Sequence, residues 1–238
     1  MPYISIIIPV HNDAAELSKT ILGIVQTTNQ EDCEIIVVND ASTDGVKPSL
    51  ISKTITNSRR VGVSPSRHIG ALQAKGDWLL FMDSHMRFEP GWLDKAIAVL
   101  KAGAASTLYC GTVVYCIGET PNIVGMPSNY HGAKFHVHGP HPKTLKTQIF
   151  DAIWAEKQLD HNPIIQCVMG ACYFIHAFEY FRLSPLEHLR TWGCEEEMLS
   201  LKTWLSGGEV RLLSDVRVGL VWRTAKKLPY SLFDWEKM

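Results

Sequence analysis

The stretch Gly76–His85, which reads GDWLLFMDSH, decides the fold expected for this chain. Its apolar centre, Trp78–Met82, has the composition of a buried strand that delivers Asp83 to its C-terminal end. Side chains two residues apart in a strand point the same way, so Asp83 and His85 are expected side by side where the sheet meets solvent. A carboxylate oxygen beside an imidazole nitrogen suits Mn²⁺ or a similar divalent ion. An ordinary strand ending in a polar turn is the alternative interpretation of this stretch alone.

The residues before this stretch indicate a βαβ unit. Tyr3–Val10 is a continuous apolar run typical of a buried strand, and Asp13 is placed to cap a following helix. The apolar positions of that helix recur at helical spacing, at Leu17, Ile21, Leu22, Ile24 and Val25. Glu34–Val38 is predicted as the next strand. Strand, helix and strand at this spacing predict a parallel sheet.

The remaining elements predict a single α/β domain over residues 1–238. Further helices are expected at Ser64–Ala74, Gly91–Lys101 and Glu195–Leu205, and further strands at Leu108–Ile117, Val168–Ile175, Val210–Leu213 and Val216–Trp222. From Gly118 to Pro163 the sequence is polar, rich in His and Pro, and without a clear element. We therefore expect a mostly parallel central sheet flanked by helices, with a regular first half and a more irregular second half.

Polar residues follow three of the predicted strands. They are Pro9–Asn12, Asn39–Asp44 and Asp83–His85. In open parallel sheets, ligands bind in the crevice outside the carboxyl ends of the strands. Three polar strand ends that converge on one crevice predict a ligand site more strongly than any one of them.

Composition limits the classes of partner. The formal net charge of -1 argues against broad electrostatic attraction to nucleic acid or to an anionic membrane. No apolar run approaches the roughly 18 residues that cross a bilayer, and the N-terminus does not resemble a signal peptide. We therefore expect a cytoplasmic protein without integral membrane association. The six cysteines lack metal or disulfide spacing, so most are expected to be buried free thiols.

Short motifs follow one another along most of the chain. In order, they are Ile6–Asn12, Val38–Asp44, Ser66–Ala71, Asp83–His85, Met169–Phe174, Trp192–Glu196 and Arg217–Arg223. Together they resemble the family 2 glycosyltransferases, which have the Rossmann-like GT-A fold. The DxH form of the metal-binding element, at Asp83–His85, is most similar to that of the polypeptide N-acetylgalactosaminyltransferases. The resemblance spans roughly residues 3 to 223, apart from an unmatched segment at about 130–163.

The resemblance implies a metal-dependent transfer of a hexose or N-acetylhexosamine from a UDP-sugar to an acceptor hydroxyl. It places a nucleotide-binding half at about residues 1–105 and an acceptor-binding half at about residues 106–238. Mn²⁺ or Mg²⁺ would be held by Asp83 and His85, where the ion offsets charge on the departing UDP. The DxH element favours retention of the anomeric configuration. Adjacent carboxylates at Glu195 and Glu196 leave inversion open.

The resemblance also assigns residues to the donor. These are Pro9, His11, Asp40, Arg67, Asp83 and Ser84. Asp40 is expected to accept a hydrogen bond from uracil N3–H, with a turn-capping role as the alternative. Arg67 is expected to pair with the nucleotide, because a guanidinium suits phosphate geometry. Arg59 and Arg60 compete for that role, and a solvated helix arginine is the alternative.

The catalytic group is expected at the start of the last predicted helix. One of Glu195 and Glu196 would bind sugar hydroxyls, and the other would position or deprotonate the acceptor hydroxyl. A nearby carboxylate also stabilises an oxocarbenium-like transition state. The alternative is a favourable interaction of both carboxylates with the helix N-terminus. Gly170 and Trp192 are expected to shape the pocket for the sugar and the acceptor.

Some residues depart from the family pattern. Leu220 stands where these transferases place a third metal ligand, a histidine, while Glu196 replaces an Asn and Cys194 replaces a Gly. A catalytically impaired nucleotide-sugar-binding protein is therefore the alternative function. A nucleotidyltransferase is disfavoured because no Gly-rich basic loop follows the first strand.

Two further properties are left open by the sequence. The histidines of the irregular segment could suggest zinc, but they lack cysteine partners and regular ligand spacing: His131, His136, His138 and His141. A mobile loop on the acceptor side is the preferred interpretation. The sequence leaves the acceptor open among a protein, a glycan, a lipid, a metabolite and a modified nucleic-acid base.

Overall fold

The structure is a computed structural model that describes residues 1–47, 52–116, 131–136, 151–155, 161–190 and 193–221. Ten strands and five helices occur in these segments. The strands are β1 (Ile4–Val10), β2 (Cys33–Asn39), β3 (Lys53–Thr56), β4 (Trp78–Met82), β5 (Met86–Phe88), β6 (Leu108–Cys116), β7 (Ala133–His136), β8 (Asp151–Trp154), β9 (Cys172–His176) and β10 (Val210–Val221). The helices are α1 (Ala14–Thr27), α2 (Val63–Ala71), α3 (Trp92–Ala102), α4 (Ala177–Leu183) and α5 (Glu195–Leu205).

Eight strands form one central sheet in the order β3-β2-β1-β4-β9-β6-β10-β5. The pairs β3–β2, β2–β1, β1–β4 and β6–β10 are parallel. The three antiparallel pairs arise where β9 lies between β4 and β6 and where β5 joins β10. The predicted α/β architecture with a mostly parallel sheet is therefore confirmed. Strands β7 and β8 form a separate antiparallel pair.

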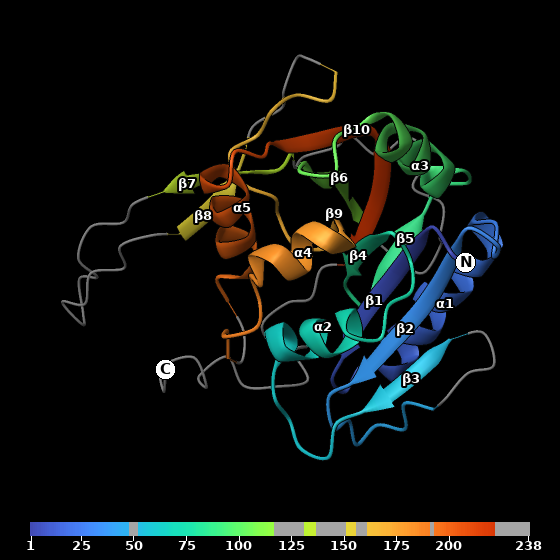
Figure 1. Ribbon diagram of the computed structural model, residues 1–238. Coiled ribbons are helices and arrows are strands. Elements are labelled where there is room, and N and C mark those ends of the chain that lie inside the picture. Colours follow the sequence, from blue (N-terminus) through green and yellow to red (C-terminus); the bar gives the residue numbers. More distant parts are fainter. Residues whose placement is uncertain (48–51, 117–130, 137–150, 156–160, 191–192, 222–238) are drawn as a thin grey trace.

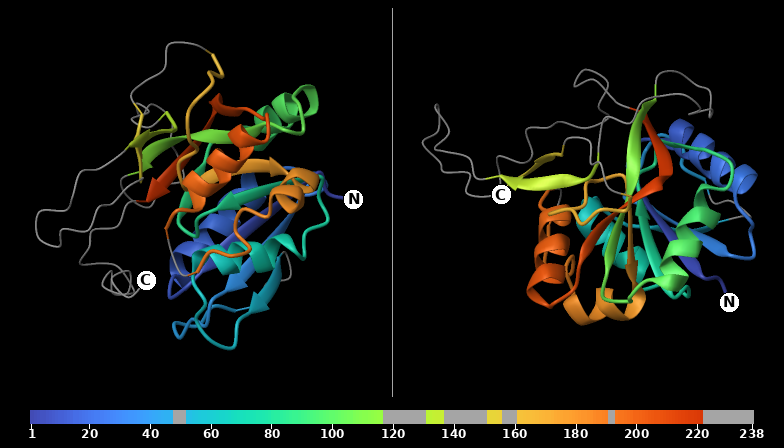
Figure 2. Two further views of the ribbon diagram at one scale, coloured as in Figure 1. Left: turned by 60° about the vertical axis from the view of Figure 1, so that its left-hand side comes forward. Right: turned by 90° about the horizontal axis from the view of Figure 1, so that it is seen from above.

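Helices cover both faces of the sheet, as the view from above in Figure 2 shows most clearly. Helices α1 and α3 lie on one face, and α2, α4 and α5 lie on the other. All seven residues of β1 are buried because both faces of this strand are covered. This double coverage explains the continuous apolar run at the N-terminus.

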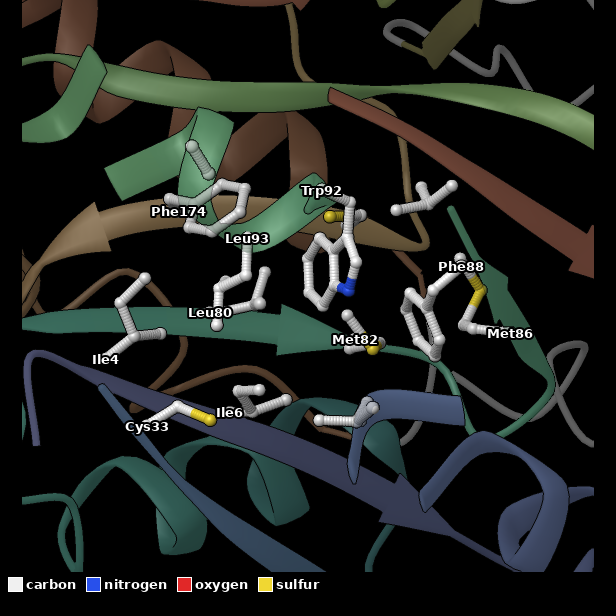
Figure 3. Close-up of a cluster of buried hydrophobic side chains, with 14 of the residues drawn as sticks. Ile4, Ile6, Cys33, Leu80, Met82, Met86, Phe88, Trp92, Leu93 and Phe174 are labelled. Atoms are coloured by element: carbon white, nitrogen blue, oxygen red, sulfur yellow. The ribbon is translucent and has the colours of Figure 1, made fainter. Parts of the chain in front are cut away.

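Alternation along the strands divides the core into two layers. Ile4, Ile6 and Ile8 face the layer of α1 and α3, whereas Ile7 faces the layer of α2. Figure 3 shows part of the first layer, in which the rings of Phe88 and Trp92 stack with centroids 4.8 Å apart. Packing in these two layers holds the strands in position, and the polar loop residues follow the ends of those strands.

The first helix forms as predicted, but its start is held differently. Asp13 occupies the N-cap position and makes no capping hydrogen bond. Instead, the carboxylate of Asp44 accepts a hydrogen bond from the Ala14 amide at 2.7 Å. Leu22, predicted on the buried face, is 53% exposed. The carboxylate of Asp13 instead contacts Ser84 and His85.

Several predicted boundaries are corrected by the structure. Strand β9 begins at Cys172 rather than Val168, because Ala171 has a positive φ of 131° that interrupts an extended strand. The two strands predicted near the C-terminal end are one strand, β10, with a register shift between Leu213 and Arg217. The prediction missed β3, β5, β7, β8 and α4, which are all seven residues or shorter. Trp192 lies outside the described residues.

We predict that Gly70→Ala destabilises the fold by about 1–3 kcal/mol. A Cβ at Gly70 would meet the Ile7 side chain and lie 3.2 Å from Val38 Cγ2, where α2 packs against the sheet. Urea unfolding measures the change in free energy. The matched control is Leu72→Ala, whose side chain is 58% exposed, and its effect is expected to stay within about 0.5 kcal/mol. Equal stability of Gly70→Ala and the wild type would contradict this packing.

Candidate functional site

The ends of β1 and β2 are joined by hydrogen bonds. The Asp40 amide donates to the Val10 carbonyl at 2.8 Å, and His11 Nδ1–H donates to the Asp40 carbonyl at 2.6 Å. Asn12 accepts from the Thr43 amide at 2.8 Å. Pro9 lies within β1, opposite Val38. Two of the three polar strand ends predicted to converge therefore form one connected loop pair.

Asp40 holds the loop that leads into α2. Its carboxylate accepts hydrogen bonds from the amides of Val61 and Gly62, both at 2.8 Å, and from Asn57 Nδ2 at 2.9 Å. The residue is 3% exposed. The structure thus gives Asp40 a loop-positioning contact, and its contact with a uracil base stays a prediction.

Arg67 is buried on α2 beneath the strand ends. Its side chain is 4% exposed, and Nη2 donates to Asp83 Oδ1 at 3.0 Å. Nη1 lies 3.7 Å from both Glu195 Oε1 and Glu196 Oε1. The guanidinium also lies over the Tyr173 ring, 5.3 Å from its centroid. The interpretation of Arg67 as a solvated helix arginine is therefore wrong. Arg59 and Arg60, the other candidates for pairing with the nucleotide, are exposed.

Three carboxylates surround this one buried cation. Burial alone would lower the pKa of Arg67, but Tyr173 and the carboxylates of Asp83, Glu196 and Glu195 raise it overall, so the guanidinium stays charged. Burial, and then the charge of Glu195, raise the pKa of Glu196 from its ordinary 4.5 to about 8, although Arg67 opposes the rise. The protonated form of Glu196 is therefore favoured relative to that of an ordinary glutamate.

The two glutamates of α5 differ in position. Glu195 is 2% exposed, and its Oε2 accepts a hydrogen bond from the Gly193 amide at 2.8 Å. The side chain of Glu196 is 18% exposed. A Cβ added at Gly170 would lie 2.6 Å from Glu196 Oε1, so this glycine makes room for the carboxyl group. Glu196 is thus the more accessible of the two.

Three polar atoms in this cluster lack a hydrogen-bond partner among the described residues. They are Arg67 Nε, the Tyr173 hydroxyl and Glu195 Oε1. Buried polar groups are normally paired, so unpaired atoms gathered in one cluster indicate a place for water or a polar ligand. Tyr173 was not predicted as a site residue, and no signal in its strand-like sequence distinguishes it from core aromatics.

Asp83 and His85 keep the alternation expected of an extended segment. Their side chains are 29% and 21% exposed, whereas Ser84 between them is 6% exposed. Backbone hydrogen bonds hold both residues. The Asp83 amide donates to the Ala171 carbonyl, and the His85 carbonyl accepts from the Val221 amide. Figure 1 shows β4 leading into β5 at this point.

The donor set at this bend fits part of a divalent-cation site. Asp83 supplies carboxylate oxygen and His85 supplies imidazole nitrogen, both suitable for Mn²⁺. Within the described segments, no group of three His, Cys, Asp or Glu residues could hold a metal. Leu220 is 6% exposed and belongs to the hydrophobic core. Substrate oxygens and water are suitable ligands to complete the shell of such an ion.

The other histidines and the cysteines add no metal site in the described part of the chain. His131 and His136 are described, whereas His138 and His141 lie outside the described residues. Five cysteines are buried free thiols, as predicted, and burial raises the pKa of Cys110 to about 12. Cys194 is exposed and has a φ of 65° at the N-cap of α5. This left-handed backbone explains why glycine suits the position.

A sequence profile named Glycosyl transferase family 2 matches residues 5–152. Human polypeptide N-acetylgalactosaminyltransferase 15 is 27% identical over 237 residues, covering 94% of this chain and 36% of the relative. A crystal structure of GalNAc-T7 with UDP, GalNAc and Mn²⁺ aligns with a TM-score of 0.75 at 20% identity, over 94% of this chain and 44% of that one. A crystal structure of S. aureus TarS 1–349 in complex with UDP-GlcNAc aligns with a TM-score of 0.68 at 15% identity, over 100% of this chain and 64% of that one.

The chain spans less than half the length of the N-acetylgalactosaminyltransferases that it resembles. The two structural neighbours confirm the GT-A fold expected from the sequence motifs.

No helix within the described segments is long and apolar enough to span a membrane. The cytoplasmic location inferred from the sequence stays a prediction.

Glu196 gives a testable pH dependence. The folded state holds its proton up to about pH 8, whereas the ordinary carboxyl releases it near pH 4.5, so this residue's contribution to stability falls as pH rises through that window. Glu196→Gln should therefore lose stability less steeply than the wild type between pH 5 and 9 in urea unfolding. Glu209→Gln, which removes a surface partner of Arg211, is the control and should keep the wild-type slope. Parallel pH profiles for wild type and Glu196→Gln would contradict the raised pKa.

A second prediction concerns the backbone at Cys194. Cys194→Gly should be more stable than Cys194→Ala by about 1 kcal/mol, because only glycine lacks the Cβ that disfavours a left-handed φ. Thermal and urea unfolding of the two variants measure the difference. Both variants lack the thiol, so the comparison isolates the backbone effect. A less stable glycine variant would show that this φ is not maintained.

Proposed function

The chain belongs to glycosyl transferase family 2, and on that basis we propose that it transfers an N-acetylhexosamine from a UDP-sugar to an acceptor hydroxyl. The sugar is proposed from the names of the relatives and from the UDP, GalNAc and UDP-GlcNAc in the neighbouring structures. A divalent ion, Mn²⁺ or Mg²⁺, is part of the proposal. The acceptor is a hydroxyl of a protein, glycan, lipid, metabolite or modified nucleic-acid base.

The observation that carries the proposal is the position of Arg67 between two sets of carboxylates. On one side it binds Asp83 at the end of β4, and on the other it approaches Glu195 and Glu196 at the start of α5. In the proposed reaction Asp83 lies on the side of the diphosphate and Glu196 lies on the side of the sugar. A sugar transfer needs these two regions next to each other, because the bond that breaks joins the sugar to the diphosphate.

The donor half orients the nucleotide. Asp83 and His85 would hold the divalent ion, which supplies charge stabilisation to the departing UDP. Pro9 near the end of β1, with His11 and Asp40 in the joined loops beyond β1 and β2, would frame the base. Buried Arg67 would stay close to Asp83 and add a fixed positive charge near the phosphates.

The glutamates are proposed to divide the work at the sugar. Buried Glu195 positions Arg67 and the start of α5, while the more exposed Glu196 contacts substrate. Because the pKa of Glu196 is raised, its protonated form is favoured, and in that form the carboxyl would donate a hydrogen bond to a substrate oxygen. A protonated carboxyl is a poor in-line base, which favours retention over inversion. Trp192 and Gly170 are proposed to shape the acceptor side.

The second candidate is a nucleotide-sugar-binding protein with impaired chemistry. The observation that favours it is Leu220, which is packed in the core where a histidine ligand would stand in the resembled family. Binding of a UDP-sugar without hydrolysis or transfer would support this candidate. The anomeric configuration of any product, measured by NMR, separates retention from inversion.

We predict that Asp83→Asn lowers Mn²⁺-dependent UDP-sugar hydrolysis or transfer by about 100-fold or more, because it removes a charged metal ligand. The assay is UDP release from a panel of UDP-sugars, with and without Mn²⁺. Asp94→Asn changes an exposed carboxylate on α3 and serves as the charge-matched control. Unfolding temperatures of both variants establish that the fold is retained. Full activity of folded Asp83→Asn would contradict the metal assignment.

A further inference from the structure

Asp13 is a buried carboxylate at the bend that follows β4. It is 8% exposed and lies just before α1, which it does not cap. Its Oδ2 accepts a hydrogen bond from Ser84 Oγ at 2.6 Å and lies 3.3 Å from His85 Nδ1. Asp13 therefore contacts two of the three residues in the proposed metal-binding segment.

The backbone of the same bend is also held by neighbouring elements. Thr20 Oγ1 on α1 donates to the Ser84 carbonyl at 2.7 Å and accepts from the Met86 amide at 2.9 Å. The Val221 amide of β10 donates to the His85 carbonyl at 3.0 Å. With its backbone held on both sides, His85 has limited freedom to move, and the contact with Asp13 can determine how its ring is oriented.

The chemistry of this contact selects one form of the imidazole. An ionised carboxylate only accepts hydrogen bonds, so the Nδ1 beside Asp13 is favoured to carry the hydrogen. The lone pair of a neutral imidazole is then on Nε2, the nitrogen directed away from Asp13. Metal-binding histidines commonly donate their other ring N–H to a carboxylate, which fixes both tautomer and ring orientation.

We propose that Asp13 is a positioning residue that holds His85 as its Nδ1–H tautomer and presents Nε2 to the divalent cation. This inference rests on the proposed function, since it assumes that His85 binds the metal. Ser84, which was assigned to the donor from sequence, has its hydroxyl directed to Asp13 instead. Its role here is to help hold the Asp13 carboxylate in place.

The first test measures Mn²⁺ affinity by electron paramagnetic resonance, using the full chain with and without UDP. Asp13→Asn should weaken Mn²⁺ binding about 10–100-fold, because an amide can offer its N–H to Nδ1 and favour the other tautomer. Glu16→Gln is the charge-matched control, since Glu16 lies in the first turn of α1, close to Asp13 in sequence, and pairs with Arg87 and Lys19. Its Mn²⁺ affinity should equal that of the wild type.

The second test observes the His85 ring directly in the metal-free protein. Nitrogen-15 NMR at about pH 8.5, where an ordinary imidazole is neutral, distinguishes the two tautomers. A His85→Gln sample assigns the signal. The wild type should show Nδ1–H and Asp13→Asn should show an increased Nε2–H fraction, whereas a purely structural Asp13 would leave the tautomer unchanged.

The outcomes separate this inference from the proposed function. Equal Mn²⁺ affinity in wild type and folded Asp13→Asn would overturn the positioning role, as would an Nε2–H tautomer in the wild type. Absence of Mn²⁺ binding by the wild type, with or without UDP, would overturn the metal role of His85 and with it the positioning role. In that case the NMR result would still show whether Asp13 fixes the ring, so the failed step is identified.

Discussion

The structure depends on placing one guanidinium inside the protein. A buried charge is strongly unfavourable unless other charges or hydrogen-bonding groups compensate for it. Arg67 on α2 meets this condition only because Asp83 follows β4 and the two glutamates begin α5. The requirement links segments that are far apart in the sequence, so the candidate donor and acceptor regions are held together by the same interaction.

Carboxylates organise the rest of the site as well. Asp40 binds the amides that precede α2, Asp44 binds the first amide of α1, and Asp13 binds Ser84. Each bond fixes a loop that carries a residue assigned to substrate or metal. The acidic residues at the strand ends therefore fall into two groups, those that face a ligand and those that hold the loops in position. Sequence spacing does not distinguish the two groups.

Unusual backbone conformations occur where these segments meet. Ala171, at a φ of 131°, precedes β9, and its carbonyl accepts the Asp83 amide. Cys194, at a φ of 65°, precedes the glutamates of α5. Left-handed or otherwise strained residues persist only when surrounding contacts hold them. Two of the six non-glycine residues with positive φ in the described segments thus lie close in sequence or by hydrogen bond to the carboxylates that compensate the charge of Arg67.

The sequence alone determined the family, the α/β fold and the strands that carry the polar loops. Strands β1 and β4 are buried on both faces, so nearly all of their residues are apolar. Such continuous apolar runs can be recognised directly in the sequence. Helix α5 was predicted with its observed bounds, Glu195–Leu205, because carboxylates favour a helix start and Gly207-Gly208 marks its end. Short strands such as β5 were missed, because three residues contain too little periodicity to indicate an element.

Only the tertiary structure decided which polar side chains face one another. The sequence indicated Arg67, Asp83 and the glutamates separately, but not that one guanidinium contacts all three carboxylates. Asp13 was interpreted as a helix cap, and Tyr173 was not distinguished from the core. The physical reason is that hydrophobic periodicity is a local property of the chain. Charge compensation and hydrogen-bond pairing depend instead on distances between segments that the folded sheet brings together.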